Sequence, residues 1–588
     1  MSTEHLITEH LDLWTSAVTY KNGKGRGNNG EPKLTGIDKL RELILELAVR
    51  GKLVPQDPEE EPASKLLERI EKEKERLHNE GKIRRPKRLS FDSEDKPFEL
   101  PATWKWTCLG EIGQIVGGGT PKSKVSSFWA SNGIKWLTPA DLYGFEGKYV
   151  YSGRRDISQE GLDKSSATLL PAGSVLFSSR APIGYVAISG SPLATNQGFK
   201  SCVPYLQGLS EYLFYFLKRS AKFIDDSASG TTFREISGSK MAQVPVALPP
   251  LEEQERIVET IDELMALCDR LEQQTCDQFS AHETLVDTLL DTLTRSQDAA
   301  ELPENWARLV AHFDTLFTTE HSIDRLKQTI HELAVKGLLV PQDPNDEPAS
   351  KLLARTAAEK ERMTLKGGIR KSKALPGIRE DEIPFKLPVG WSIARLDDIT
   401  EIQSGIAKGK KHTGSETVVL PYLRVANVQR AALLLDQVKE IEIAKSDMDR
   451  YLVLRRDLLI TEGGDWDKVG RTAIWNGSIH PIVHQNHVFR ARLLLEEQNE
   501  RWIEEYLNSR FAREYFAESS KQTTNLASIN KTQLRSCTVP IPPIQEQERI
   551  LERSDELMAL CDRLKSRLKT VKEIQQSLAD TIVKQAVA

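Results

Sequence analysis

The stretch from Pro249 to Leu271, PPLEEQERIVETIDELMALCDRL, occurs a second time from Pro542 to Leu564 as PPIQEQERILERSDELMALCDRL. Each copy opens with two prolines, which fix the start of a helix, and continues with acidic residues that suit the positive end of a helix. Apolar residues then recur at steps of three and four, the heptad pattern of helices that pack on one another. We therefore predict two long helices, one from Leu251 to about Arg295 and one from Ile544 to about Val587.

The apolar seam of these helices identifies the residues that should be buried. In the second helix the seam is interrupted by Ser554 and Gln575 and consists of Ile550, Leu557, Cys561, Leu564, Leu568, Val571, Leu578 and Ile582. In the first helix it consists of Ile257, Ile261, Leu264, Cys268 and Leu271. The simplest interpretation is the core of a helical hairpin, about 60 to 70 Å long at ~1.5 Å per residue. Cys268 and Cys561 are then packing residues.

Two further segments are repeated. Ile37 to Leu67 reads IDKLRELILELAVRGKLVPQDPEEEPASKLL, and Ile323 to Leu353 reads IDRLKQTIHELAVKGLLVPQDPNDEPASKLL. An opening segment, PFELPATW from Pro97 to Trp104, recurs as PFKLPVGW from Pro384 to Trp391. Between each opening segment and the following Pro-Pro lies a block that matches the other only faintly. We divide the chain into a helical N-terminal segment (1–97), a first variable block (98–250), a central helical segment (251–383), a second variable block (384–543) and a C-terminal helix (544–588).

The order of these segments is circular. The first part of the central segment resembles the C-terminus and its second part resembles the N-terminus, so joining the two chain ends would regenerate a copy of the centre. This order predicts a pseudo-two-fold arrangement with the chain ends close in space and two similar faces, each able to hold one copy of the same partner. The predicted fold class is α+β, with two small α/β domains separated by long antiparallel, coiled-coil-like helical spacers.

The two variable blocks share a skeleton. LLPAGSVLFSSR, GYVAI and TNQGFK, which begin at Leu169, Gly184 and Thr195, parallel LVLRRDLLITEG, GRTAI and QNHVFR, which begin at Leu452, Gly470 and Gln485. The short apolar runs within them, bounded by Gly and Pro, predict strands. EYLFYFLKRS and EEYLNSRFAREYF predict helices, so each block is expected to form a small α/β domain. The two blocks share their apolar positions and differ in their polar positions. This pattern is expected of two copies of one recognition domain that bind different sequences.

Composition limits the class of protein. A chain of 588 residues is too long to fold around a single hydrophobic core, so we expect several domains. The chain contains no apolar run long enough for a membrane-spanning helix. The polar start MSTEHLITEH lacks the pattern of a secretory signal, so we expect a cytoplasmic protein. The six cysteines form no C-x-x-C pair and are read as reduced packing thiols. The net charge of -5 hides two mildly basic variable blocks, +4 and +2, beside a central segment of -11, which gives weak support to contact with nucleic acid.

Candidate contacts in the first variable block lie in its polar loops. The glycines of GGGTPKSK permit close backbone approach, and its lysines suit phosphate. Arginine can read guanine, and Asn or Gln can read adenine. For any single residue a structural role is more common than a contact with DNA. For a tryptophan such as Trp129 or Trp136, we rate burial in the core about twice as highly as contact with DNA. The candidates are Lys122, Lys124, Trp129, Lys135, Arg180, Asn196, Gln197, Thr231, Thr232 and Arg234.

The second variable block supplies a corresponding set. In the second block the basic loop GIAKGKK stands where the first block has GGGTPKSK. The contacts of this loop can therefore be inferred from the first block only in part. The candidates are Lys408, Lys410, Lys411, Arg424, Asn427, Arg430, Lys468, Arg471, Asn486, Lys521 and Lys531, with His412, Gln429 and Gln485 beside them.

The motifs of several enzyme classes are absent from the sequence. GIAKGKK lacks the Ser or Thr of a phosphate-binding loop, so no ATP motor is expected. The two Pro-Pro pairs, LPPL and IPPI, do not match the D/N-P-P-Y/F tetrapeptide of adenine methyltransferases. His480, His484 and His487 lie in a mixed run without a second ligand cluster, so we expect no metal site. We predict that this chain has no catalytic residues and no cofactor of its own.

These features together resemble the specificity subunit of a type I restriction-modification enzyme. The matching motifs are G-G-T-P at Gly118, P-A-G-S-V-L at Pro171, T-N-Q-G at Thr195, G-T-T at Gly230, P-P-L-E-E-Q-E-R-I at Pro249 and AVRGKLVPQDP at Ala48. The resemblance covers nearly the whole chain. It implies that each variable block is a target-recognition domain that reads one half of a split, asymmetric double-stranded DNA site, and that the helices set the gap.

The resemblance also implies partners. Two modification subunits would use S-adenosylmethionine to methylate adenine, and restriction subunits would use ATP and Mg to translocate and cut DNA. The helical segments would bind the modification subunits.

Two alternatives from other classes remain open. A self-contained DNA methyltransferase or nuclease with duplicated domains would bind S-adenosylmethionine or act on DNA alone. A coiled-coil scaffold would show no preference for DNA.

Overall fold

The computed structural model describes residues 10–20, 32–83, 89, 96–180, 182–228, 234–295, 301–369, 373–407, 416–464, 468–523 and 526–587. The chain divides into two compact units. Unit 1 consists of Met1–Phe279 and Thr570–Ala588, and unit 2 consists of Ser280–Lys569. The last part of the chain therefore folds with the N-terminal part, as the circular order of the repeats predicts.

The two long helices have the predicted bounds. Helix α9 spans Leu251–Arg295 and helix α19 spans Ile544–Val587. The boundary between the compact units falls inside each of them, after Phe279 in α9 and after Lys569 in α19. Within the described part of the chain, no helix is long and apolar enough to cross a membrane.

The predicted seam of α19 is only partly correct. Ile550, Cys561 and Ile582 are buried, but Val571 and Leu578 are 47% and 49% exposed. A straight α-helix has 3.6 residues per turn, so a heptad seam drifts by about 20° per repeat unless the helices supercoil. Val571 and Leu578 have rotated out of the core and belong to an exposed apolar stripe, whereas Ile582 remains in the core beside Ala579.

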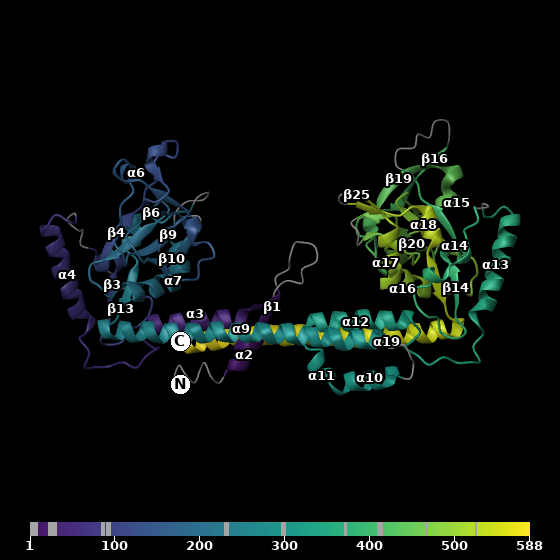
Figure 1. Cartoon of the computed structure of the whole chain (residues 1–588), viewed down its shortest axis with the longest axis horizontal. Helices are drawn as coiled ribbons and strands as arrows, with labels where there is room; N and C mark the ends of the chain where they lie inside the picture. The colour runs from purple at the N-terminus through teal and green to yellow at the C-terminus, as the bar shows by residue number, and fades with distance from the viewer. Residues whose placement is uncertain are drawn as a thin grey trace. The chain divides into compact units, whose positions relative to one another are not determined.

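Unit 1 places its helical segment beside the start of α9. Helix α3 (Thr35–Val49) runs alongside α9 (Figure 1), where Arg41 pairs with Asp269 and Glu272 at 2.7 and 2.6 Å. Ala579 and Ile582 of α19 join the same core. The other elements of this segment are α2 (Leu11–Ser16), β1 (Val18–Tyr20), β2 (Pro32–Leu34) and α4 (Ala63–Asn79).

Unit 2 repeats this arrangement with α12 (Glu320–Val335). Lys327 of α12 pairs with Asp562 of α19, and Asp324 pairs with Lys565 at 2.9 Å. Through the repeat, Lys327 and Asp562 are the counterparts of Arg41 and Asp269. The remaining helices of this segment are α10 (Glu301–Ala311), α11 (Phe313–Leu316) and α13 (Ala349–Leu365).

The repeat reaches further toward the N-terminus than the sequence comparison detected. His10 precedes α2 and His312 precedes α11 with nearly the same backbone angles, φ -117° and ψ 21° against φ -116° and ψ 19°. In both places the histidine carbonyl accepts hydrogen bonds from the residues three and four positions on. Only the histidine and one aspartate, Asp12 or Asp314, are shared in these short helices, so the sequence signal is weak.

Each variable block is fastened to its long helix by the same buried contact. The indole Nε1 of Trp104 donates to the Glu253 carboxylate at 2.9 Å, and Trp391 donates to Glu546 at 3.0 Å. Burial raises the pKa of both carboxyl groups. The following glutamine of each P-P-x-x-E-Q segment donates its side-chain amide to the carbonyl of the first proline. This accounts physically for the duplicated motif, because its Glu joins the start of a block to its end.

A glycine and an ion pair complete this junction in both units. Gly51 and Gly337 have φ of +68° and +72°, and a Cβ on either would meet the tryptophan and proline of the opening segment at 3.1 Å or less. Arg256 pairs with Glu60, and Arg549 pairs with Asp346 at 2.6 Å. The AVRGKLVPQDP and AVKGLLVPQDP segments therefore form equivalent packing surfaces for the opening segments of the two blocks.

The first variable block is built from two sheets above a two-stranded base. The base pairs β3 (Lys105–Cys108) with β13 (Pro245–Leu248). The larger sheet has the order β4-β12-β9-β10-β7, and the smaller has the order β11-β6-β8-β5. The strands are β4 (Gly113–Gly117), β5 (Trp129–Ala130), β6 (Ile134–Leu137), β7 (Tyr149–Val150), β8 (Arg155–Ile157), β9 (Val175–Ser179), β10 (Ile183–Ser189), β11 (Ala194–Thr195) and β12 (Lys200–Pro204); the helices are α5 (Leu109–Ile112), α6 (Gln159–Asp163), α7 (Ser210–Asp226) and α8 (Gly238–Ala242).

The second variable block follows the same plan with smaller sheets. Its base pairs β14 (Ser392–Arg395) with β27 (Thr538–Ile541), and its main sheet has the order β15-β24-β20-β22. The strands are β15 (Thr400–Ser404), β16 (Thr417–Leu423), β17 (Val428–Gln429), β18 (Ala432–Leu433), β19 (Lys439–Ala444), β20 (Leu458–Thr461), β21 (Gly463–Gly464), β22 (Thr472–Ile474), β23 (Val483–His484), β24 (Val488–Leu493), β25 (Lys521–Thr523) and β26 (Leu526–Ser528); the helices are α14 (Leu396–Ile399), α15 (Met448–Tyr451), α16 (Glu500–Asn508), α17 (Arg510–Ser519) and α18 (Lys531–Ser536).

The strands expected in both blocks are confirmed, and one expected helix is divided. EEYLNSRFAREYF forms α16 and α17, which are separated at Ser509 with φ -66° and ψ 165°. Of the six cysteines, Cys276 is half-buried and the others are buried. Both blocks are therefore α/β domains, and the fold is α+β as predicted.

Candidate nucleic-acid interface

In the first block, four polar loops meet at one edge of the larger sheet. The loop after β4 crosses the end of β11, where the Gly119 amide donates to the Thr195 carbonyl at 2.8 Å. A Cβ on Gly118 would lie 2.0 Å from the Asn196 carbonyl, so only glycine permits this crossing. The hydroxyl of Thr120 donates to the Gln197 side chain.

Two backbone bonds bring the remaining loops to the same edge. The amide of Ser179, at the end of β9, donates to the Gly198 carbonyl at 2.7 Å, and the Ile236 amide donates to the Ser179 carbonyl at 3.0 Å. The structure thereby gathers six of the expected residues, which come from four separate places in the sequence: Lys122, Lys124, Arg180, Asn196, Gln197 and Arg234. Lys122 and Lys124 are exposed.

The second block builds the same edge with different side chains. The Ile406 amide donates to the His484 carbonyl at 2.8 Å, and a Cβ on Gly405 would lie 2.2 Å from that carbonyl oxygen. The Ile529 amide donates to the Glu462 carbonyl at 2.9 Å, in the place of the Ile236 to Ser179 bond. Asn486 lies here, where its amide donates to the Ile406 carbonyl at 2.9 Å.

Hydroxyl groups fix the turn that follows in both blocks. Ser178 Oγ accepts from the Tyr185 amide at 2.7 Å, and Thr461 Oγ1 accepts from the Arg471 amide at 3.0 Å. The two frames therefore superpose in their hydrogen bonds as well as in sequence, while the side chains that they carry differ.

A second group of expected residues in the first block lies on the smaller sheet. The guanidinium of Arg155 stacks 3.7 Å from the centre of the half-buried Trp129 ring, whereas Trp136 is buried and donates to the Gly119 carbonyl at 3.0 Å. Lys135 pairs with the buried Asp156 at 2.7 Å. Trp136 is thus a core residue. Arg155 is an additional candidate for contact with DNA, which the sequence did not indicate because it is identified only by its stacking on the Trp129 ring.

In the second block, the expected arginines gather around the β17–β18 hairpin. The Ala431 amide donates to the Thr472 carbonyl at 2.9 Å, which sets the hairpin beside β22. Arg471 then donates to the Gln429 side chain at 2.5 Å, and Arg424 donates to the Gln437 carbonyl at 2.8 Å. Arg430 follows Gln429 in the hairpin, and Lys468 precedes Arg471 on the approach to β22. Arginine and glutamine at this spacing offer donors and acceptors to base edges.

Some expected residues are engaged in the fold. Asn427 is 2% exposed, and its side chain accepts from the Arg424 amide and donates to the Leu434 carbonyl. Lys531 lies at the start of α18, where burial lowers its pKa. Arg234 donates to the Asp225 carbonyl. Asn427 and Lys531 are therefore parts of the fold and not of the DNA-contacting surface.

Several expected contacts lie outside the described residues, namely Thr231, Thr232, Lys408, Lys410 and Lys411. Lys521 is placed in β25, and its side chain is not among those described. These contacts stay predictions.

The histidines of the second block have separate roles. His484 is fully buried, its Nδ1 lies 2.7 Å from the Val488 carbonyl, and burial lowers its pKa to about 3, so the ring is neutral. His487 is exposed and pairs with Glu462 at 2.6 Å. His484 holds β23 to β24, which places the Gln485–Asn486 turn.

The edge strand β22 is anchored by a buried carboxyl, which leads to a pH-dependent prediction. Glu504 of α16 accepts from the Ile474 amide at 2.9 Å, and burial raises its pKa to about 7. The value in an unfolded chain is about 4.3, so this group stabilises the fold most below that pH and the contribution is lost as pH rises through about 7. Glu504→Gln should therefore raise the free energy of unfolding by about 2 kcal/mol more at pH 8.5 than at pH 5.5. Urea denaturation at both pH values measures this.

The exposed Glu496 supplies the control for this experiment, because Glu496→Gln should change stability little at either pH. An equal effect of Glu504→Gln at both pH values would show that the carboxyl is ionised throughout.

Residues 101–278 and 388–573 match the family described as the type I restriction modification DNA specificity domain. Over their full lengths, the chain is 37% identical to the EcoEI specificity subunit and 38% identical to the EcoAI specificity subunit, both of type I restriction enzymes of Escherichia coli. The chain belongs to the family of type I restriction-modification specificity subunits. A relative from Methanocaldococcus jannaschii, the MjaIX specificity subunit, is 24% identical over 76% of this chain and 84% of its own length.

Membership of this family gives the two blocks their role. Each matched region begins in the opening segment of a variable block and ends inside the long helix that follows. The variable blocks are accordingly the two target-recognition domains of a specificity subunit, and sequence-specific recognition of DNA is the function of the chain.

Proposed function

We propose that the chain reads a bipartite, asymmetric DNA site, with one target-recognition domain on each half. The observation that carries this proposal is the edge built twice from the same backbone bonds but with different polar side chains. In the first domain it presents Arg180, Asn196 and Gln197. In the second it presents Asn486, with Gln429 and Arg471 on the adjoining hairpin. Direct readout depends on which donors and acceptors face the bases, so the two domains recognise different half-sites.

Phosphate contacts come from the loops beside these edges. Lys122 and Lys124 follow the Gly118 crossing, and Lys408, Lys410 and Lys411 follow the Gly405 crossing in sequence. Contacts of this kind position the duplex and carry no sequence information. Each domain thus combines a lysine-bearing loop with a group of amide and guanidinium side chains.

The helical segments serve assembly with two modification subunits, which would carry S-adenosylmethionine, and with ATP-dependent restriction subunits. The exposed apolar stripe supports this assignment. Leu285 of α9 and Leu578 of α19 occupy equivalent positions of the repeat and are 51% and 49% exposed. Leu289 and Ile574 extend the stripe in the two units. Apolar residues exposed at helical spacing mark surfaces for partner helices.

We expect the isolated chain to bind DNA weakly and to gain affinity and specificity on assembly. Its domains carry net charges of only +4 and +2, and phosphate neutralisation supplies most non-specific affinity. The chain alone should show a Kd of ~10⁻⁵ M at physiological salt, and its complex with modification subunits a Kd of ~10⁻⁹ M for the target sequence. Titration of labelled duplexes with and without the target measures both. Tight specific binding by the chain alone would contradict the expectation.

The same preparations separate this function from the alternative of a self-contained enzyme. The purified chain should neither bind radiolabelled S-adenosylmethionine nor methylate DNA, whereas the complex should do both. Methyl transfer by the chain alone would replace the proposal with the enzyme alternative.

A further inference from the structure

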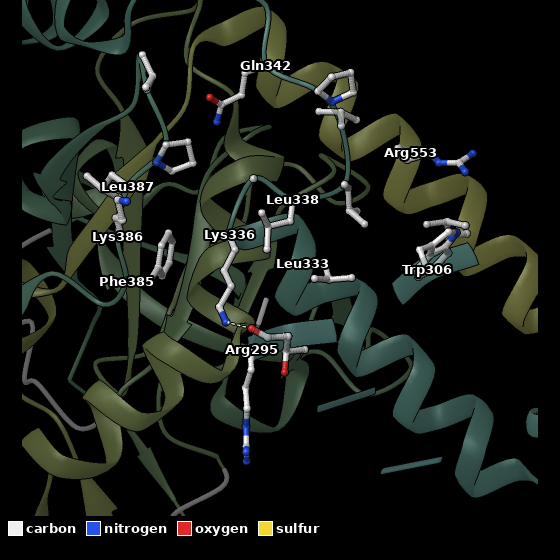
Figure 2. A pocket seen from close by; sticks show the side chains of 18 residues that line it. Arg295, Trp306, Leu333, Lys336, Leu338, Gln342, Phe385, Lys386, Leu387 and Arg553 are labelled. Carbon is white, nitrogen blue, oxygen red and sulfur yellow. Dashed lines mark hydrogen bonds between the residues drawn. The ribbon is translucent and has the colours of Figure 1, made fainter. Parts of the chain in front are cut away.

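A groove of about 1230 Å³ opens in unit 2 beside the end of α12 (Figure 2). Its walls come from the turn after α12, the opening segment of the second domain, α19 and the last residues of α9. The volume exceeds the ~300–1000 Å³ of pockets for small ligands. It is suited to several residues of a peptide.

The floor of the groove is apolar. Leu333 is fully buried beneath it, and Leu338, Leu339, Val340 and Leu387 are half-buried along it. Val389 stands at the rim and is 88% exposed. Covering such a floor with apolar side chains would remove it from water, which favours an occupant with an apolar face.

The charged residues that line the groove are all cationic: Arg295, Lys336, Lys386 and Arg553. Lys336 donates to the Thr294 carbonyl at 2.6 Å and pairs with Glu332 at 3.3 Å, and Arg553 pairs with Glu556 at 2.8 Å. Arg295 and Lys386 are exposed, and no acidic residue pairs with them within the described ranges. Two cations at the rim are therefore available to an acidic occupant.

The counterpart of this groove in unit 1 differs in both respects. Leu53 and Val54, the equivalents of Leu339 and Val340, are buried at 7% and 9% exposure. Glu99 stands in the place of Lys386, and Thr260 stands in the place of Arg553. Lys336 and its equivalent Arg50 do not differ in this way, because each is paired with the glutamate one turn earlier, Glu332 and Glu46. The two units share a frame, but the open cationic groove belongs to unit 2.

We propose that this groove binds a short acidic segment of a partner protein, with apolar side chains on the floor and Asp or Glu residues against Arg295 and Lys386. The proposal extends the assembly role proposed above by naming the chemistry of one contact, and it makes that contact specific to unit 2. The apolar floor favours a protein segment over DNA, because nucleic-acid backbones offer phosphate and sugar and no apolar face to cover it.

The proposal can be tested on the full-length chain with a fluorescein-labelled peptide of sequence DELLEDLLEE as the probe. Fluorescence anisotropy should show saturable binding by the wild-type chain. A peptide with lysine in place of every acid should bind at least about tenfold more weakly. Arg295→Glu combined with Lys386→Glu should weaken binding of the acidic peptide at least about tenfold, equivalent to the loss of two exposed charge contacts.

Two further variants keep the result interpretable. Val389→Glu adds an acid at an exposed rim position, where it cannot disturb packing, and should also weaken the acidic peptide. Glu99→Lys changes the equivalent position in unit 1 and should leave binding unchanged. Circular dichroism and thermal denaturation confirm that each variant is folded.

Three results would overturn the proposal. The first is an absence of saturable binding by the wild-type chain, and the second is equal binding by wild type and the groove variants. The third is loss of binding to a duplex of arbitrary sequence in the groove variants, together with displacement of the peptide by that duplex, which would assign the groove to DNA. The peptide titration is read separately from target-specific DNA binding and methylation, so its failure leaves the proposed function standing.

Discussion

Exchange of residues 98–250 for the matching block of a related specificity subunit is expected to change one half of the methylated DNA sequence and leave the other half intact. The first target-recognition domain is closed on its own base strands, β3 and β13, and is fastened to the helices through Trp104 and Glu253. The same contacts hold the second domain, so they do not depend on the polar side chains that each domain carries. An exchanged block should therefore pack on the helices in the same way while bringing its own polar edge. Sequencing of methylated adenines in cells that carry the exchanged subunit and its modification partner measures the result.

The reciprocal exchange of residues 384–543 is the control, and it should change only the other half. A change in both halves after either exchange would show that the two domains do not read independently. A complex that forms but methylates the original sequence would remove the exchanged block from DNA recognition altogether.

Lengthening both long helices by four residues is expected to widen the gap between the half-sites by one or two base pairs while the half-site bases stay the same. Four helical residues add ~6 Å, against ~3.4 Å per base pair of B-DNA. The insertions belong after Phe279 in α9 and after Lys569 in α19, where the boundary between the compact units crosses each helix. Methylated motifs again provide the measurement.

A single insertion after Leu271, the simplest design from the sequence, would be a poor choice. It would separate Asp269 from Glu272, which together hold Arg41 of α3. That variant serves as a control for disrupted packing and should lose activity. An active complex with matched insertions and an unchanged gap would show that the helices do not set the spacing.

The sequence predicts the long helices and the duplicated frame well, because both depend on local patterns. Pro-Pro fixes the first residue of α9 and α19, and a seam of steps of three and four extends over their length. It predicts the later seam less well, because the buried face there passes through Ala579 and Ile582 and leaves Val571 and Leu578 exposed, a shift that a fixed heptad ignores. The break at Ser509 is likewise invisible in an uninterrupted amphipathic run.

The candidate interface could be predicted only in part. The loops at Gly118, Asn196 and Arg180 were identified by residue type, but their meeting at one edge depends on strand pairings between distant segments. Asn427 has the residue type of a base reader, yet its side-chain oxygen and nitrogen are both hydrogen-bonded to nearby backbone groups. Arg155 gains its interest from the ring of Trp129, a contact that no local pattern indicates.

The Trp104–Glu253 and Trp391–Glu546 contacts also have an evolutionary consequence. Each contact joins a residue at the beginning of a domain to one just beyond its end, and both residues lie in segments that occur twice in the chain. The gene therefore carries near-repeated stretches at the borders of the part that determines the target. Homologous recombination within those stretches would exchange a whole reading domain between alleles and would restore the tryptophan–glutamate contact in the product. A lineage can in this way acquire a new recognition sequence in one genetic event, without passing through subunits whose domains no longer fit their helices.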